Sequence, residues 1–169
     1  MKNILIKKIE EKDIPDVVDI QINSWQTTYK DIIDANFLNS MDKEQIVERR
    51  KKDYQNTLFI VAKLDNEIVG FCRYIDNNNA TKEYDDIDCE IIALYVKNNY
   101  KRHGIGKQMF DYVLNEFKEK NKTKMIIWCL KENYPSRKFY EAMGGKIKGE
   151  HKINFGDKEY DEVGFEFLI

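Results

Sequence analysis

The sequence has few cysteines, histidines and prolines: three, two and two among 169 residues. Cys72, Cys89 and Cys129 are widely spaced, lie in apolar surroundings and form no Cys-x-x-Cys pair or Cys/His cluster. Free buried thiols are therefore expected rather than a disulfide or a metal site. We expect no metal cofactor.

Long apolar stretches are also missing. No window approaches the ~18 apolar residues that a membrane-spanning helix needs, and the apolar run near the N-terminus is too short for a signal peptide. These absences predict a cytoplasmic protein with no membrane partner.

Net charge is small, at -2 with a pI near 5.8, and acidic and basic residues are mixed along the chain. A nucleic-acid-binding domain would be basic, so no nucleic-acid partner is expected. With a hydrophobic fraction of 42%, the length suits one compact domain over residues 1–169.

The most informative stretch spans residues 90–107. Its first part, residues 91–96, has the composition of a buried strand, and a polar turn then leads to Gly104 and Gly106. Apolar residues next recur at three- and four-residue steps, at Met109, Phe110, Val113, Leu114 and Phe117. The pattern predicts a strand, a glycine turn and an amphipathic helix.

A helix that begins at a glycine turn is suited to bind phosphate. Its first backbone N–H groups lack partners, and the helix dipole adds positive charge there. Basic residues surround the turn. A turn without function is the alternative for an isolated Gly-x-Gly. The spacing fits neither a Walker loop nor a dinucleotide fingerprint, so a nucleotide-phosphate binder is disfavoured.

Two motifs together resemble one family. The segment YKRHGIG at residues 100–106 is similar to the acyl-CoA pyrophosphate loop of the GCN5-related N-acetyltransferases, Arg/Gln-x-x-Gly-x-Gly/Ala. The segment NYPSRKFYEAMGG at residues 133–145 resembles the second cofactor segment of that family. The order and separation also match, and the likeness extends over residues 3–168.

Two positions depart from the family pattern. Lys101 stands where Arg or Gln is usual, which keeps a cation but loses the planar multi-donor head. Gly145 stands where many relatives carry Phe. The backbone part of phosphate binding is thus better supported than the side-chain part.

The rest of the chain has the element order of this family. Strands are expected near residues 4–6, 58–64, 68–75, 87–96, 123–130, 146–155 and 159–168, and helices near 13–29, 43–52, 104–120 and 133–143. Asp13 is a plausible helix start. The resemblance implies a mixed α/β fold, with about seven strands in a mostly antiparallel sheet, a splayed central strand pair and about four helices on both faces.

The resemblance also implies acetyl-CoA as cosubstrate. The residues that would bind it are those of the central strand, the glycine loop and the second segment: Leu94, Tyr95, Val96, Lys101, Arg102, His103, Gly104, Ile105, Gly106, Lys107, Asn133 and Ser136. A backbone N–H at or near Val96 would face the thioester oxygen. For Asn133, helix capping is an equally simple role.

Tyr140 is the candidate general acid, because the family places a tyrosine at this point and a phenol is protonated at neutral pH. Packing on an apolar helix face is the alternative. Glu90 is the candidate base, acting through water. The nearby Glu83, Asp86 and Asp88 would attract a cationic acceptor or serve only as surface charge.

Acceptor-binding residues are expected in residues 24–40, 76–86 and the last hairpin. Trp25 and Tyr29, four residues apart on one predicted helix, are candidates for this pocket, with core packing as the alternative. His151 falls on the last hairpin, where a surface position is expected.

The sequence therefore predicts an N-acetyltransferase that acts by direct attack of a primary amine, on a small molecule or a peptide terminus. A non-catalytic acyl-CoA-binding or sensing module is the alternative. Relatives of this family are often dimeric, so a homodimer is left open.

Overall fold

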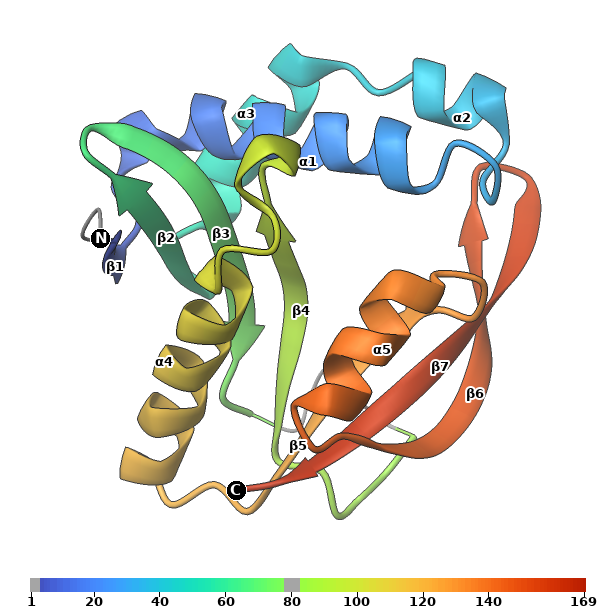
Figure 1. Cartoon of the computed structure of the whole chain (residues 1–169). Helices are drawn as coiled ribbons and strands as arrows, with labels where there is room; N and C mark the ends of the chain where they lie inside the picture. Colours follow the sequence, from blue (N-terminus) through green and yellow to red (C-terminus); the bar gives the residue numbers. More distant parts are fainter. Residues whose placement is uncertain (1–3, 78–82) are drawn as a thin grey trace.

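The structure, a computed structural model, describes residues 4–77 and 83–169. Part of residues 76–86, where acceptor-binding residues were expected, lies outside the described residues. The predicted order of strands and longer helices is confirmed, and the described residues add one short α-helix at Ala35–Asn39 (Figure 1). The strands are β1 Ile4–Lys8, β2 Leu58–Leu64, β3 Glu67–Ile75, β4 Cys89–Val96, β5 Lys124–Leu130, β6 Lys146–Phe155 and β7 Lys158–Leu168. The helices are α1 Ile14–Thr28, α2 Ala35–Asn39, α3 Lys43–Asp53, α4 Ile105–Glu119 and α5 Tyr134–Ala142, with short 3-10 helices at Glu11–Asp13 and Asn98–Tyr100.

The described strands form one seven-stranded sheet in the order β1-β2-β3-β4-β5-β7-β6. All neighbours are antiparallel except β4 and β5. The predicted fold class is confirmed. Where about four helices were expected, the described residues contain five α-helices, because α2 was not foreseen.

The helices cover both faces of the sheet. On one face, α4 and α5 pack on a large cluster that includes Met109, Phe110, Tyr140 and Phe165. On the other face, Val17 and Ile20 of α1 pack on β2 and β3. Two apolar layers are therefore buried, which explains the consecutive apolar residues of the inner strands.

Local capping by a side chain explains where α2 begins, but not where α1 begins. Asp34 accepts hydrogen bonds from the backbone of Asn36 (3.0 Å) and Phe37, and this cap starts the short helix α2. Asp13 was expected to start α1, but its side chain makes no cap there. It accepts instead from the Glu10 backbone (3.0 Å) and pairs with Lys63 (2.9 Å). Asp13 therefore anchors the preceding turn to the sheet.

The central strands diverge along their length. β4 and β5 pair only over Cys89–Ile91 and Met125–Ile127. The register of β4 against β3 shifts at the same level, since Arg73 pairs with Ala93 and Tyr74 with Ile91, leaving Ile92 as an extra residue. Such a bulge bends its strand. The bend separates β4 from β5 beyond residue 92, and this is the predicted splayed pair.

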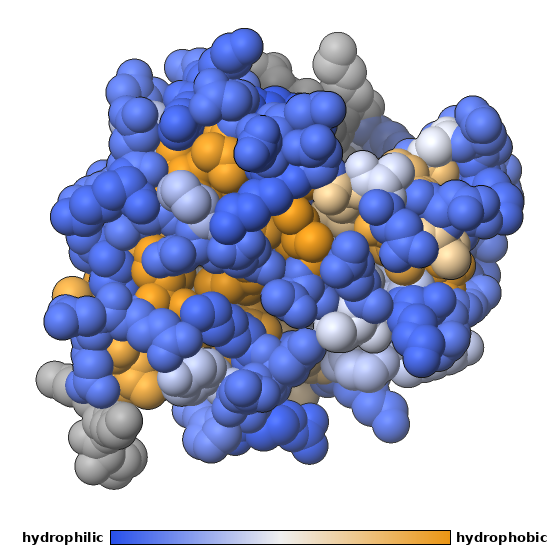
Figure 2. Space-filling model, turned by 90° about the horizontal axis from the view of Figure 1, so that it is seen from above, coloured by the Kyte–Doolittle hydropathy of each residue, from blue (hydrophilic) through white to orange (hydrophobic). Residues whose placement is uncertain are grey.

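No helix in the described part of the chain is long and apolar enough to span a membrane. The three cysteines are free and buried, as expected. Seen from above, the surface is mostly hydrophilic, with apolar atoms visible in recesses between polar side chains (Figure 2).

Candidate active site

A cavity of about 310 Å³ occupies the space between the diverging strands. We call it the cofactor cavity. Its walls come from β4, the glycine loop, β5 and α5, so it joins the two motifs found in the sequence. Among the predicted site residues, it is lined by Tyr29, Leu94, Tyr95, Val96, Lys101, Arg102, Gly104, Ile105, Gly106, Lys107, Asn133, Ser136 and Tyr140.

The glycine loop presents unpaired backbone donors. Arg102 (φ 68°) and Gly104 (φ 76°) both adopt left-handed conformations, which turn successive N–H groups toward one side. Within residues 4–77 and 83–169, the first amide of α4 with an acceptor is that of Gln108, which donates to the Gly104 carbonyl (3.0 Å). The amides of residues 102–107 are thus available to an anion.

Lys101 lines the same wall, and desolvation lowers its pKa. His103 was predicted to bind the cofactor through its backbone N–H more than through its ring. Its side chain is exposed and does not line the cavity. Its Nδ1 faces the Lys101 carbonyl at 2.8 Å. Any contact from residue 103 would come from the backbone.

The second segment forms α5, whose two ends are both capped. Asn133 is buried, and its side-chain oxygen accepts from the Ser136 backbone (3.3 Å), so capping is at least one of its roles. At the other end, Gly144 (φ 94°) donates to Glu141 and Gly145 to the Tyr140 carbonyl, a Schellman motif. A Cβ at Gly145 would lie 2.6 Å from the Phe167 ring, which explains why Phe cannot stand there.

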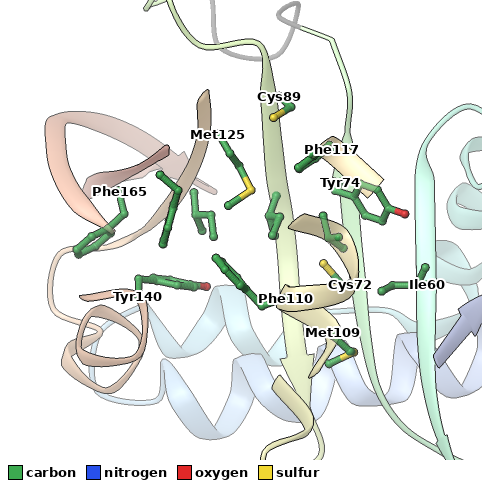
Figure 3. Close-up of a cluster of buried hydrophobic side chains, with 14 of the residues drawn as sticks. Ile60, Cys72, Tyr74, Cys89, Met109, Phe110, Phe117, Met125, Tyr140 and Phe165 are labelled. Carbon is green, nitrogen blue, oxygen red and sulfur yellow. The ribbon is translucent and has the colours of Figure 1, made fainter. Parts of the chain in front are cut away.

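Tyr140 extends from α5 into the cluster that holds Phe110 and Phe165 (Figure 3). It is 7% exposed and lines the cofactor cavity. Burial, and then the proximity of Cys129 and Tyr95, raise the pKa of Tyr140 well above the ordinary value for a phenol. Tyr140 therefore keeps its proton through the neutral range.

Two more phenols meet in this cavity. The hydroxyls of Tyr29 and Tyr95 interact, and Trp25 Nε1 donates to the Tyr95 hydroxyl (2.9 Å). Trp25 itself does not line the cavity. It packs edge-on against Tyr29 and Phe155 at 5.2 and 5.0 Å between ring centroids. Trp25 thus orients Tyr95, a residue of the cavity wall, without lining the cavity itself.

A second cavity of about 260 Å³ adjoins the first, since Ile92 and Trp128 line both. We call it the acidic cavity. Glu90 lies here and not in the cofactor cavity. Because side chains alternate along β4, Glu90 and Ile91 point to opposite faces of the sheet. The remaining lining residues are Glu83, His151, Ile153 and Glu162.

His151 and Glu162 were missed from the sequence. His151 was expected at the surface, but its ring lies between Glu83 and Glu162. The signal that could have found Glu162 is its pairing with His151 across the β6–β7 hairpin, but a one-residue change of register would have put them on different faces.

Two of the acidic residues predicted near Glu90 do not line the acidic cavity, because their carboxylates bind other groups. Asp88 accepts from the backbone of Thr123 (2.9 Å) and Lys124 (3.2 Å). Asp86 pairs with Lys124 and Lys148. Of the three carboxylates near Glu90, only Glu83 faces the acidic cavity.

No group of three or more His, Cys, Asp or Glu side chains that could hold a metal ion occurs in the described residues.

The chain is similar to known proteins along most of its length. The family model described as "Acetyltransferase (GNAT) family" matches residues 20–145. A Bacillus subtilis protein named uncharacterized N-acetyltransferase YuaI is 23% identical over 161 residues, 95% of this chain and 91% of its own length. A spermidine N(1)-acetyltransferase from Thermoplasma acidophilum is 24% identical over 94% of this chain and 99% of its own.

Solved structures show the same fold. The crystal structure of PaiA N-acetyltransferase from Thermoplasma acidophilum, in complex with coenzyme A, has a TM-score of 0.73 at 21% identity and covers 99% of both chains. A probable acetyltransferase from Staphylococcus epidermidis has a TM-score of 0.75 at 16% identity, with 98% of this chain and 99% of that one covered.

Proposed function

Because the chain belongs to the acetyltransferase (GNAT) family and is an N-acetyltransferase, we propose that it acetylates a primary amine of a small molecule or a peptide terminus. The acetyl donor would be acetyl-CoA. One observation carries the proposal: the unpaired amides of the glycine loop and the protonated Tyr140 line one cavity.

The cofactor cavity fits acetyl-CoA. Backbone amides of residues 102–107 would bind the diphosphate, with Lys101, Arg102 and Lys107 adding positive charge. Leu94, Tyr95 and Val96, on the diverging part of β4, would hold the pantetheine arm, with Asn133 and Ser136 opposite. When bound, acetyl-CoA supplies an acetyl group activated as a thioester.

Tyr140 would act as the general acid. Its raised pKa keeps the hydroxyl protonated and ready to donate to the departing sulfur. A backbone N–H at or near Val96 would polarise the carbonyl to be attacked. Tyr29 would lie at the acceptor side of the cavity, and Trp25 would support it from behind.

Direct attack is favoured over an acetylated enzyme. Cys129 is a nucleophile type that lines the cofactor cavity. Burial, followed by the nearby charge of Glu162, raises the pKa of its thiol to about 12. The reactive form of cysteine is the thiolate, so this thiol is a poor nucleophile at neutral pH.

The amine would enter through the acidic cavity, because this cavity meets the cofactor cavity at Ile92 and Trp128. Its carboxylates favour a cationic acceptor, and a relative is named for spermidine. Glu90 would take the amine proton through a water molecule.

The test is the release of CoA thiol from acetyl-CoA with a panel of polyamines, other primary amines and peptides with free N-termini. We expect release only when an amine is present, with acetylated amine as the product by mass spectrometry. A protein that binds acetyl-CoA but releases no thiol with any acceptor would be the non-catalytic alternative.

A further inference from the structure

His151 is held between two carboxylates. Its Nδ1 lies 2.9 Å from Glu83 Oε1, and its Nε2 lies 2.9 Å from Glu162 Oε2. A neutral imidazole has one N–H and cannot donate to both carboxylates. In this geometry the ring is either imidazolium or shares a proton with one of its two partners.

The surrounding sheet fixes the ring. His151 and Glu162 are cross-strand partners in β6 and β7. The imidazole stacks on Trp128 with ring centroids 3.7 Å apart and planes at 15°. A Cβ at Gly164 would lie 2.9 Å from the Trp128 ring, so glycine is what allows the indole to lie close over β7. The β6–β7 hairpin and the stacked Trp128 therefore fix the position of the His151 ring.

The three residues connect the reaction site with solvent. Glu162 is 13% exposed, His151 25% and Glu83 48%, so exposure increases along the chain of hydrogen bonds. At the inner end, the charge of Glu162 contributes to the raised pKa values of Cys129 and Tyr95, whose largest cause is burial. Both residues line the cofactor cavity, so Glu162 lies close to the site of transfer.

We propose that Glu162, His151 and Glu83 form the path by which the proton taken from the acceptor amine leaves the site. This inference rests on the proposed function. An amine that arrives as ammonium must lose a proton before attack, and Glu90, which shares the acidic cavity with Glu162, would take it through water.

The proton balance is simple. Glu90 returns the proton to water in the acidic cavity as that water protonates Glu162. The O–H bond of Glu162 then breaks as a neutral His151 gains N–H at Nε2. The Nδ1–H bond then breaks as Glu83 takes that proton and releases it to solvent. One proton enters and one leaves. The ring returns to its starting tautomer when it loses the Nε2 proton to water and gains one at Nδ1 from water.

The charged groups around the ring come from four elements. Glu83 precedes β4, Glu90 lies on β4, Glu162 on β7, and Lys148 on β6 over the Tyr84 ring, paired with Asp86 and Glu166. An imidazole that carries a proton on both nitrogens cannot accept a further proton. Turnover limited by this path therefore falls at acidic pH.

The test compares His151→Gln with wild type in the full chain, using the best acceptor from the amine panel. We expect kcat to fall about 10- to 100-fold with the KM for acetyl-CoA unchanged. The acid limb of the pH profile should move, and added imidazole buffer should raise the rate of the variant but not of wild type. Glu150→Gln is the matched control, because Glu150 is the neighbour on β6 and pairs with the exposed Lys131.

Buffer rescue separates a proton path from a structural role, since a distorted site gains nothing from a proton carrier. If His151→Gln does not fold, Glu83→Gln decides, because this side chain is half exposed; it should lower kcat and respond to buffer in the same way. The proposed proton path would be contradicted if the folded His151→Gln variant kept the wild-type pH profile. It would also be contradicted if the variant were slow and its rate did not rise with added imidazole buffer. If the path fails this test but Tyr140→Phe has a reduced kcat, the proposed function stands. If the wild-type protein is inactive with every amine, both the proposed function and the proton path are wrong.

Discussion

At the scale of single residues, the candidate acid Tyr140 and the candidate base Glu90 lie on opposite faces of the sheet. Tyr140 belongs to the cluster under α4 and α5, and Glu90 lies in the acidic cavity. They can serve one reaction only because β4 and β5 diverge between them. The two groups can therefore be tested separately.

Tyr140→Phe should lower kcat about 100-fold or more, because the proton donor is removed while the ring that packs on Phe165 is kept. The KM for acetyl-CoA and the unfolding midpoint should hardly change. Steady-state thiol release measures both kinetic constants. Tyr134→Phe is the control, since Tyr134 is on the same helix but 60% exposed. Wild-type turnover in Tyr140→Phe would remove the acid role.

Glu90→Gln should lower kcat and change the acid limb of the pH-rate profile, because the amide keeps the shape but cannot accept a proton from water. Measurement needs kcat across the pH range with a saturating amine. Glu119→Gln, exposed on α4, is the control. The role of base is lost if the profile of Glu90→Gln matches that of wild type.

At the scale of elements, Gly106 in the first turn of α4 and Gly144 after α5 have different roles. A Cβ at Gly106 would make only ordinary contacts, at 3.6 Å to Phe139 and 3.8 Å to Val96. A Cβ at Gly144 would meet no neighbour within 4 Å, but the backbone there has a φ of 94°. Packing therefore does not require glycine at position 106, whereas the left-handed backbone at position 144 does.

Gly106→Ala should leave the fold intact or slightly more stable, because alanine favours a helix by up to about 1 kcal/mol over glycine. Binding of CoA should weaken about tenfold, since the added methyl keeps a diphosphate away from the amides. Calorimetric titration with CoA and a denaturant melt give the two values. Unchanged CoA affinity would argue against the backbone cradle.

Gly144→Ala should lower the free energy of unfolding by about 1–2 kcal/mol, because a Cβ is strained in the left-handed region. Gly144→Asn should cost less, since asparagine tolerates this conformation better. Urea denaturation of both variants provides the comparison. Equal stability of wild type and Gly144→Ala would mean that the C-terminal turn of α5 relaxes freely.

At the scale of the whole molecule, the core holds thiols and phenols in their neutral forms. Burial raises the pKa of Cys72, Cys129 and Tyr140. In the unfolded chain, thiols ionise near pH 8.5 and phenols near pH 10. Above these values the unfolded state binds fewer protons than the folded one, so stability falls as pH rises.

We therefore expect full stability below about pH 8.5 and a decreasing thermal midpoint above it, toward pH 11. Thermal unfolding followed by circular dichroism across this range tests the expectation. Cys72→Ala should show a shallower decrease, since one buried thiol is removed. A midpoint that stays constant from pH 8 to 11 would contradict the linkage.

Much of the architecture was predictable from the chain because its signals are local. The apolar residues of α4 recur on one helix face, and the Gly144-Gly145 pair ends α5 where expected. Helix α2 was missed because it has five residues and depends on one cap, that of Asp34. Helix α1 begins directly after Asp13, as expected, but the Asp13 side chain does not cap it. It pairs instead with Lys63, which is far away in sequence.

By itself, the sequence determined the order of elements, the glycine turn at the head of α4 and the presence of Tyr140 in the second segment, since periodicity, caps and glycines act within a few residues. Only the tertiary structure decided which side chains share a cavity. Strand register and the bulge at Ile92 place Glu90 in one cavity with His151 and Glu162. The carboxylate of Asp88 accepts a backbone hydrogen bond instead. Trp25 lies behind the wall of the cofactor cavity, where it donates to Tyr95. These outcomes depend on pairing between distant strands, where one residue of shift reverses the face that a side chain occupies.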